Sequence, residues 1–402
     1  MNAIRLYSLI LLSLIALPVA AFAHEVERIV IDADFPGAYQ VEIADVNGDG
    51  RPDVIAVGGA TCAWYENPGW TKRVVSGPTE TPGVISSATA DLDGDGKAEI
   101  AIAFEFAMNT PATGRLALAI QPGKADGVWR LEPLAEIPSI HRLRFGDLDG
   151  DGRLDLVVAP IFGPKAKPPT FVDPARLVVF RGLKPGARPV PEPVGSWPIM
   201  HAIEVKPIFG GPRSWIVAAT DQGTPLVGWG RNQAGATHEQ WLAGRLLTGA
   251  TGAIPSKRGA SEVHVGTMSD GRRLLATIEP WHGNVVAAYQ ARIKIGAEQA
   301  KQLDPFRERK ILDDTLDQGH ALWVADVDGD GDDEILAGHR GKNHGVSLYD
   351  YNRAADSWTK TVLDRAIAAQ DLRGGDLDGD GTPDVVAAGG ETQNVVWYHF
   401  KK

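Results

Sequence analysis

Acidic side chains recur in five short loops that share one spacing. Each loop has a carboxylate or an amide at positions 1, 3, 5 and 9, and a glycine at positions 4 and 6. Oxygen ligands in so tight a loop suit Ca²⁺, a hard cation that takes about six to eight oxygens, and glycine permits the positive φ angles that wrapping an ion requires. The sequence therefore predicts up to five calcium sites. Their ligands are Asp45, Asn47, Asp49, Asp53, Asp91, Asp93, Asp95, Glu99, Asp147, Asp149, Asp151, Asp155, Asp326, Asp328, Asp330, Glu334, Asp376, Asp378, Asp380 and Asp384.

These loops differ from EF-hands in two respects. An EF-hand needs a bidentate glutamate at position 12 and a helix on each side. Position 12 is Ala or another aliphatic residue in all five loops, as at Ala56 and Ile102. The residues that follow each loop, such as those from Asp53 to Val57, have the β-branched character of strands. The loops are therefore expected to connect two strands.

The spacing of the loops predicts the architecture. Their first aspartates are 46, 56, 179 and 50 residues apart. The long gap holds two further units that keep the strands but lose the ligands, one over residues 201–219 and one over residues 262–278. Seven units of about 55 residues, each with four strands, are typical of a β-propeller. The last unit lacks a fourth strand, and residues 25–31 are expected to supply it and close the ring.

The Asp-x-Asp-x-Asp-Gly-x-x-Asp loops resemble those of FG-GAP/VCBS-repeat propellers, and the resemblance covers residues 25–402. It implies an all-β, seven-bladed β-propeller as a single domain over residues 24–402. It also implies that each calcium loop joins the innermost strand of a blade to the second strand, on one face of the ring.

The opposite face is expected to hold the histidines. Each innermost strand should begin six residues before the first loop aspartate, and this position is His in three units, at His141, His201 and His320. The other four units have Tyr39, Ile85, Ser261 and Gln370 there. Loops after the second strands reach the same face, so the predicted site also contains His282, His339, Arg340 and Glu279.

Imidazoles can bind a transition metal such as Zn²⁺ or transfer protons. The cations of Arg142, Arg340 and Lys342 would suit an anionic, enolate-like intermediate. The order of the residues does not separate base from acid.

Three short runs, over residues 141–147, 279–284 and 317–323, resemble the propeller domain of aldos-2-ulose dehydratases. This resemblance implies a carbon–oxygen lyase that dehydrates a keto-sugar, and the same groups would serve β-elimination on another saccharide. The alternative is a non-catalytic propeller that binds a carbohydrate or a protein partner. A hydrolase that uses Glu279 and Glu391 is disfavoured, because the two residues belong to different units.

Composition and the N-terminal sequence limit the classes of partner and the cellular location that are compatible with this chain. The formal net charge of −11 disfavours a nucleic-acid partner. Residues 1–23 combine Arg5, an apolar run and the small-x-small sequence from Ala21 to Ala23, which predicts a signal peptide cleaved near Ala23 and a secreted or periplasmic protein. No second apolar run is long enough to span a membrane. Cys62 is the single cysteine, so the chain forms no internal disulfide.

Overall fold

The computed structural model describes residues 25–123, 127–231, 238–291, 306 and 308–401. The predicted signal peptide and its cleavage site lie outside these residues. Within them, no helix combines the length and apolar character needed to cross a membrane.

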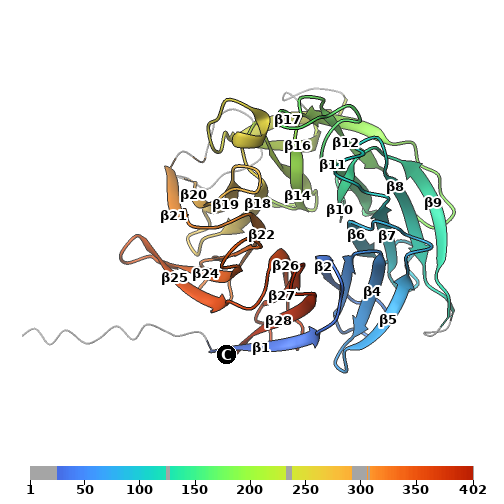
Figure 1. Ribbon diagram of the computed structural model, residues 1–402, viewed down its shortest axis with the longest axis horizontal. Coiled ribbons are helices and arrows are strands. Elements are labelled where there is room, and N and C mark those ends of the chain that lie inside the picture. Colours follow the sequence, from blue (N-terminus) through green and yellow to red (C-terminus); the bar gives the residue numbers. More distant parts are fainter. Residues whose placement is uncertain (1–24, 124–126, 232–237, 292–305, 307, 402) are drawn as a thin grey trace, which may run out of the picture.

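The described chain forms seven four-stranded antiparallel sheets arranged around a central axis (Figure 1), as the sequence predicted. The innermost strands are β2 (Ala38–Ala44), β6 (Ser86–Ala90), β10 (Ile140–Gly146), β14 (Met200–Lys206), β18 (Glu262–Thr267), β22 (Gly319–Ala325) and β26 (Ala369–Gly375). The second strands are β3 (Asp53–Gly58), β7 (Glu99–Phe104), β11 (Asp155–Pro160), β15 (Trp215–Thr220), β19 (Arg273–Glu279), β23 (Glu334–His339) and β27 (Asp384–Gly389).

The outer half of each sheet completes the blade. The third strands are β4 (Thr61–Glu66), β8 (Arg115–Ile120), β12 (Ala175–Phe180), β16 (Thr224–Gly230), β20 (Val285–Gln290), β24 (Gly345–Asn352) and β28 (Asn394–Lys401). The outermost strands are β5 (Thr71–Ser76), β9 (Arg130–Glu136), β13 (Glu192–Trp197), β17 (Gln240–Leu247), β21 (Glu308–Asp313), β25 (Ser357–Asp364) and β1 (Glu25–Asp32). A short 3₁₀ helix, η1, spans Pro255–Lys257.

The two ends of the described chain share one sheet. Strand β1 pairs antiparallel with β28, with Glu25 opposite Lys401 and Ile29 opposite Trp397. The order of this sheet is β1-β28-β27-β26, so the N-terminal strand is the outermost strand of the last blade. This is the pairing expected from the missing fourth strand of the last unit.

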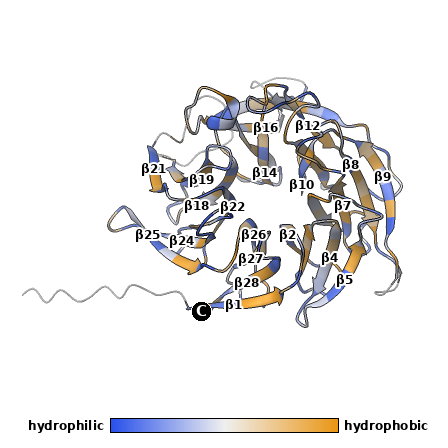
Figure 2. Ribbon diagram, viewed as in Figure 1, coloured by the Kyte–Doolittle hydropathy of each residue, from blue (hydrophilic) through white to orange (hydrophobic). Residues whose placement is uncertain are grey.

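Burial on both faces explains the continuous apolar character of the second strands. All six residues of β3 and of β11 are buried, because each blade packs on both faces against its neighbours. Hydrophobic residues accordingly occur in all seven blades (Figure 2). The resulting core is a set of clusters between adjacent blades, such as the one that joins Ile55 and Trp64 to Ile100 and Trp129.

Five innermost strands carry a β-bulge near their first residue. The register shift falls at the residue that the sequence aligned at the start of the strand, namely Tyr39, His141, His201, His320 or Gln370. A bulge adds one residue to one strand and redirects its side chain. In the other two blades the pairing of the innermost strand is regular. The five residues at these bulges all take part in the site described next.

Candidate functional site

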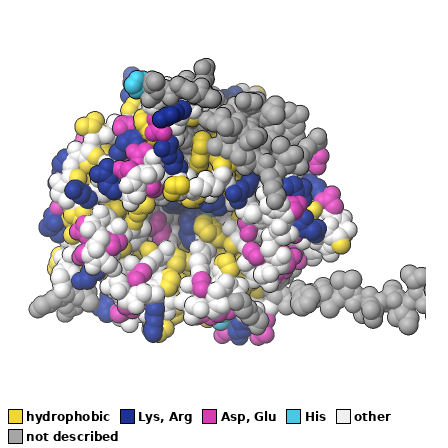
Figure 3. Space-filling view, turned by 180° about the vertical axis from the view of Figure 1, so that it is seen from behind, with side chains coloured by type: hydrophobic (Ala, Val, Ile, Leu, Met, Phe, Trp, Pro, Cys, Tyr) yellow, Lys and Arg dark blue, Asp and Glu magenta, His cyan; other side chains and the backbone are white. Residues whose placement is uncertain are grey.

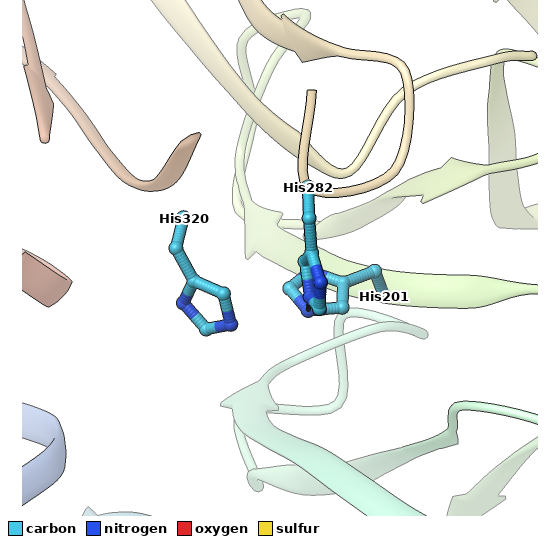
Figure 4. A group of neighbouring side chains, drawn as sticks. All are labelled: His201, His282 and His320. Carbon is cyan, nitrogen blue, oxygen red and sulfur yellow. Dashed lines mark hydrogen bonds between the residues drawn. The ribbon is translucent and has the colours of Figure 1, made fainter. Parts of the chain in front are cut away.

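Four histidine rings meet at one end of the central channel. His141, His201 and His320 lie at the bulges of three innermost strands, and His282 lies on the loop after β19. The ring centroid of His201 is 4.8 Å from those of His141, His282 and His320. His201 and His282 lie against each other with His320 opposite them (Figure 4), and nitrogens of these three rings all lie within 4.8 Å of one another.

Hydrogen bonds determine which nitrogen of three of these rings carries the proton. Nδ1 of His141 lies 2.9 Å from the carbonyl oxygen of His201, and Nδ1 of His201 lies 3.0 Å from that of Ser261. Nδ1 of His320 lies 2.6 Å from the carbonyl oxygen of Gln370. A carbonyl oxygen only accepts, so each Nδ1 donates, and Nε2 of the neutral ring keeps its lone pair. Three Nε2 lone pairs therefore face the site.

His282 has the opposite tautomer. Its Nδ1 accepts a hydrogen bond of 3.2 Å from Nη2 of Arg340, since a guanidinium only donates. The proton of the neutral ring is then on Nε2, which lies 3.1 Å from Nε2 of His201 and donates to it. The four rings thus comprise three acceptors and one donor.

All four imidazoles are neutral at pH 7. Burial lowers the pKa of each ring well below the usual value of 6.5, and the charge of Arg142 acts in the same direction at all four. A neutral imidazole can bind a metal ion or accept a proton, whereas an imidazolium cannot.

Tyr39 and two arginines complete the site. The hydroxyl oxygen of Tyr39 lies 2.9 Å from Nε2 of His141 and 3.4 Å from Nε2 of His320. The guanidinium of Arg142 lies 5.1 Å from the Tyr39 ring centroid, is 1% exposed, and has no hydrogen-bond partner for Nη2 among the described residues. Arg340 donates to the side-chain oxygen of Gln370 at 2.8 Å. Both cations therefore stand where negative charge on a bound substrate would be stabilised.

Two residues that the sequence assigned to this site lie elsewhere in the structure. Glu279 is 0% exposed, and its carboxylate accepts hydrogen bonds from Arg309 at 2.8 Å and Thr277 at 2.7 Å, within its own blade. His339 accepts from the backbone of Asp317 at 3.4 Å and lines a separate cavity of about 210 Å³ with His344. Glu279 lies at the end of β19 that reaches the predicted face, but the pleat of this strand turns its carboxylate into the blade and away from the site.

Two further residues of the site, Tyr39 and Gln370, could have been predicted from the repeat pattern. Tyr39 and Gln370 occupy the same repeat position as the three strand histidines, so their place in the ring was visible in the alignment of the units. Phe106, with its ring centroid 5.5 Å from that of His141, and Trp281, at 4.8 Å from His282, form apolar walls. Nothing in the repeat pattern indicates Phe106, because its loop is specific to one blade.

Farther along the channel, from the histidines toward the face that carries the acidic loops, charged side chains line the channel. Alternate residues of an innermost strand face the channel, and these positions include Arg142, Glu262, Asp371, Glu42 and Arg144. Burial raises the pKa of the three carboxyl groups, Glu42, Glu262 and Asp371, to about 7 each.

The channel ends in a cavity of about 330 Å³ lined by Arg144, His264 and Trp323 among others. Figure 3 shows the reverse face of the ring, which is hollowed at its centre, with Lys and Arg side chains at the wall of the hollow and Asp and Glu side chains around it.

The acidic loops share one internal geometry. In the first loop the carboxylate of Asp45 accepts from the backbone amides of Gly48 at 2.7 Å and Gly50 at 2.8 Å, and Asp53 accepts from Val46 at 2.9 Å. Gly48 and Gly50 have φ angles of 76° and 84°, which a side chain would strain. In the other four loops, oxygens of three acids lie within 4.8 Å of one another. These groups are Asp91, Asp93 and Glu99; Asp147, Asp149 and Asp151; Asp326, Asp328 and Glu334; and Asp376, Asp378 and Asp384.

Burial raises the pKa of the acid at position 9 in these loops, and at Asp53, Glu99 and Glu334 the neighbouring carboxylates add to the rise. The value is about 6 for Asp53 and Asp384, about 7 for Glu99 and about 10 for Glu334. The third loop differs, because Asp149 and Asp151 form ion pairs with Arg181 and Arg153. Carboxylates held this close repel one another, and a bound cation would remove the repulsion.

Comparison with known proteins gives three findings. The profile of the FG-GAP-like repeat family matches residues 45–102 and 326–387. Aldos-2-ulose dehydratase from Phanerodontia chrysosporium is 25% identical over an alignment of 277 residues, and the match covers 63% of this chain and 28% of the length of that relative. A solved structure of a lectin from Agrocybe aegerita, described as recognising non-reducing terminal N-acetylglucosamine, has a TM-score of 0.52 at 16% identity and covers 82% of this chain and 81% of its own.

The lectin shows a likeness of fold alone. The chain is therefore a seven-bladed propeller that contains FG-GAP-like repeats, and it is similar over part of its length to a dehydratase that is itself much longer.

Proposed function

We propose that this protein is a carbon–oxygen lyase that dehydrates a keto-sugar, or eliminates across a related saccharide, at the four-histidine site. The observation that carries the proposal is the set of three Nε2 lone pairs, on His141, His201 and His320, that neighbouring backbone carbonyls direct into one buried site. The similarity to a sugar dehydratase supports the same class of reaction.

The residues present fit a transition metal such as Zn²⁺. Nε2 of His201 and of His320 can bind it unchanged, since their Nδ1 protons are already donated to carbonyls. His282 is within reach as a third ligand, provided that Arg340 releases Nδ1 so that the proton can move there. A metal at this position would supply Lewis-acid polarisation of the substrate carbonyl.

The remaining pair, His141 and Tyr39, suits the proton transfers. Elimination requires a base for the acidic proton α to the carbonyl and an acid for the departing hydroxyl. Nε2 of His141 takes the α-proton, the electron pair of the C–H bond forms the enolate, and the C–O bond breaks as Tyr39 gives its proton to the oxygen, which leaves as water. The imidazolium then returns one proton to the tyrosinate, 2.9 Å away, and the site is restored. Arg142 and Arg340 stabilise the enolate.

The test is an assay for the ultraviolet-absorbing enone produced from a keto-sugar such as anhydrofructose. The wild-type protein, supplied with Ca²⁺ and Zn²⁺, should form the enone, and His141→Gln should lower the rate by about 10²- to 10⁴-fold. His339→Gln is the matched control, because this histidine lies in a different cavity, and it should retain activity. Absence of enone from every keto-sugar tested, or an equal loss in both variants, would count against a lyase at this site.

We also propose that the five acidic loops bind Ca²⁺, and that residues 1–23 direct export to the periplasm or the exterior. The hydrogen bonds within the loops already orient the carboxylates, and the mutual repulsion of the acids supports an ion as their partner. The calcium sites would hold the connections between the first and second strands of five blades.

A further inference from the structure

We propose that Glu262 is a positioning residue for His201, which holds this imidazole with its proton on Nδ1 and increases the affinity of Nε2 for a cation. The inference rests on the proposed function and deepens it, because it singles out one of the three strand histidines. Glu262 is the first residue of β18 and was not assigned to the site from the sequence.

The geometry places the carboxylate beside the imidazole. Oε1 of Glu262 lies 2.9 Å from Nδ1 of His201, and this side chain of His201 is 0% exposed. The N–H of His201 is directed at the carbonyl oxygen of Ser261, the residue just before Glu262. Two consecutive residues of the adjacent blade therefore place a carbonyl oxygen and a carboxylate oxygen next to the same nitrogen.

The carboxylate oxygen has no competing donor. Glu262 is 5% exposed, and its Oε1 has no hydrogen-bond partner among the described residues, so the Nδ1–H of His201 at 2.9 Å is the group that faces it. A buried carboxylate oxygen without a partner is costly, so its position against Nδ1 is significant. In its ionised form Glu262 places a negative charge next to the N–H of the imidazole, which increases the electron density at the other nitrogen, as carboxylates do for histidine ligands in metal sites.

This arrangement distinguishes His201 from the other two strand histidines. Nδ1 of His141 and of His320 also donates to a carbonyl of the next blade, but among the described residues no carboxylate forms an ion pair with either ring. At the other end of the channel, Glu204 lies 3.2 Å from Nδ1 of His264, which shows that the fold uses the same pairing elsewhere. Of the four rings at the site, the carboxylate acts on His201.

The test compares Glu262→Gln with Asp371→Asn. Both substitutions remove a buried channel carboxylate that lies in the field of Arg142, but Asp371 interacts with Arg373 and the amide of Val41, not with a histidine. The first measurement is the affinity for Zn²⁺ in excess Ca²⁺, by competition with a chromophoric chelator. Glu262→Gln should bind Zn²⁺ about 10- to 100-fold more weakly than wild type, whereas Asp371→Asn should match wild type.

The second measurement does not depend on a metal. In metal-free protein labelled with ¹⁵N-histidine, the Nδ1–H proton of His201, assigned as the signal lost in His201→Gln, should move upfield in Glu262→Gln and partly return in Glu262→Asp. Asp371→Asn should leave it in place. If wild type binds no Zn²⁺ but the signal moves, the metal proposal fails and the positioning role stands. If the signal and the affinity both stay unchanged in folded Glu262→Gln, the inference is overturned.

Discussion

At the scale of single residues, hydrogen-bond partners give chemically different roles to side chains of one type. The four rings share burial and lowered pKa, but Arg340 makes His282 a donor through Nε2, while backbone carbonyls make His141, His201 and His320 acceptors. Tyr39 is the only phenol in contact with these rings among the described residues. Its single proton can satisfy one of two neighbouring lone pairs, and a substrate oxygen could receive it instead.

Removal of the Tyr39 hydroxyl should therefore affect the reaction more than the fold. Tyr39→Phe should lower kcat by about 10²- to 10⁴-fold, the usual contribution of a positioned acid, with KM little changed. Tyr65→Phe is the matched control, since the Tyr65 hydroxyl of the first blade bonds to Asp32 of the last blade, on outer strands away from the site, and its loss should cost about 1 kcal/mol of stability with activity retained. Similar activity in Tyr39→Phe and wild type would exclude Tyr39 as the acid.

At the scale of secondary-structure elements, the bulged innermost strands both create the site and explain what the sequence could predict. The repeat spacing predicted the blades, the strand order and the position of His141, His201 and His320, because each depends on counting residues from a loop. The positions of Arg142 and Arg144 in the channel could also have been predicted, because side chains alternate between the two sides of β10. The direction of Glu279 and the loop that carries Phe106 depend on local pleat and on a loop found in one blade, so the repeat could not indicate them.

The charged layer of the innermost strands should make stability depend on pH with opposite signs at two glutamates. Burial raises the pKa of Glu42 from 4.5 to about 7, so the folded state keeps a proton that the unfolded state has lost. Its destabilising contribution is absent below pH 4.5, grows as the pH rises to 7, and reaches about 3 kcal/mol at most. Glu42→Gln should therefore gain Tm relative to wild type across this range, as followed by thermal unfolding at several pH values.

Glu204 provides the internal comparison. The pKa of its carboxyl is lowered to about 2, because the charges of Lys206 and His264 outweigh its burial. A lowered pKa stabilises the fold above pH 4.5, and this contribution is lost as the pH falls toward 2. Glu204→Gln should thus be less stable than wild type at pH 7 and should approach it in acid. The same sign for both variants would show that these charges do not control stability.

At the scale of the whole molecule, the acidic loops account for the charge of the chain. Of the twenty ligand positions only Asn47 is neutral, so nineteen of the 51 acidic residues belong to loops. Five Ca²⁺ ions would add ten positive charges to a formal charge of −11, and the loaded ring would be close to neutral. The acidity then reflects the requirements of one face of the ring, and it carries no information about the substrate at the other face.

Chelation should consequently destabilise the whole ring, because ligand binding to the folded state adds about 2.7 kcal/mol per site at a hundredfold excess over Kd. EDTA should lower Tm, Ca²⁺ should restore it, and titration calorimetry should find five sites in wild type. Asp91→Asn, which removes a carboxylate that orients two glycine amides, should lose one site and part of the Ca²⁺-dependent rise in Tm. Asp270 lies in the corresponding loop of a unit that lacks the ligand set, where it pairs with Arg272. The Ca²⁺ response of Asp270→Asn should therefore equal that of wild type. An unchanged Tm after complete chelation would show that the blades hold together through their apolar interfaces alone.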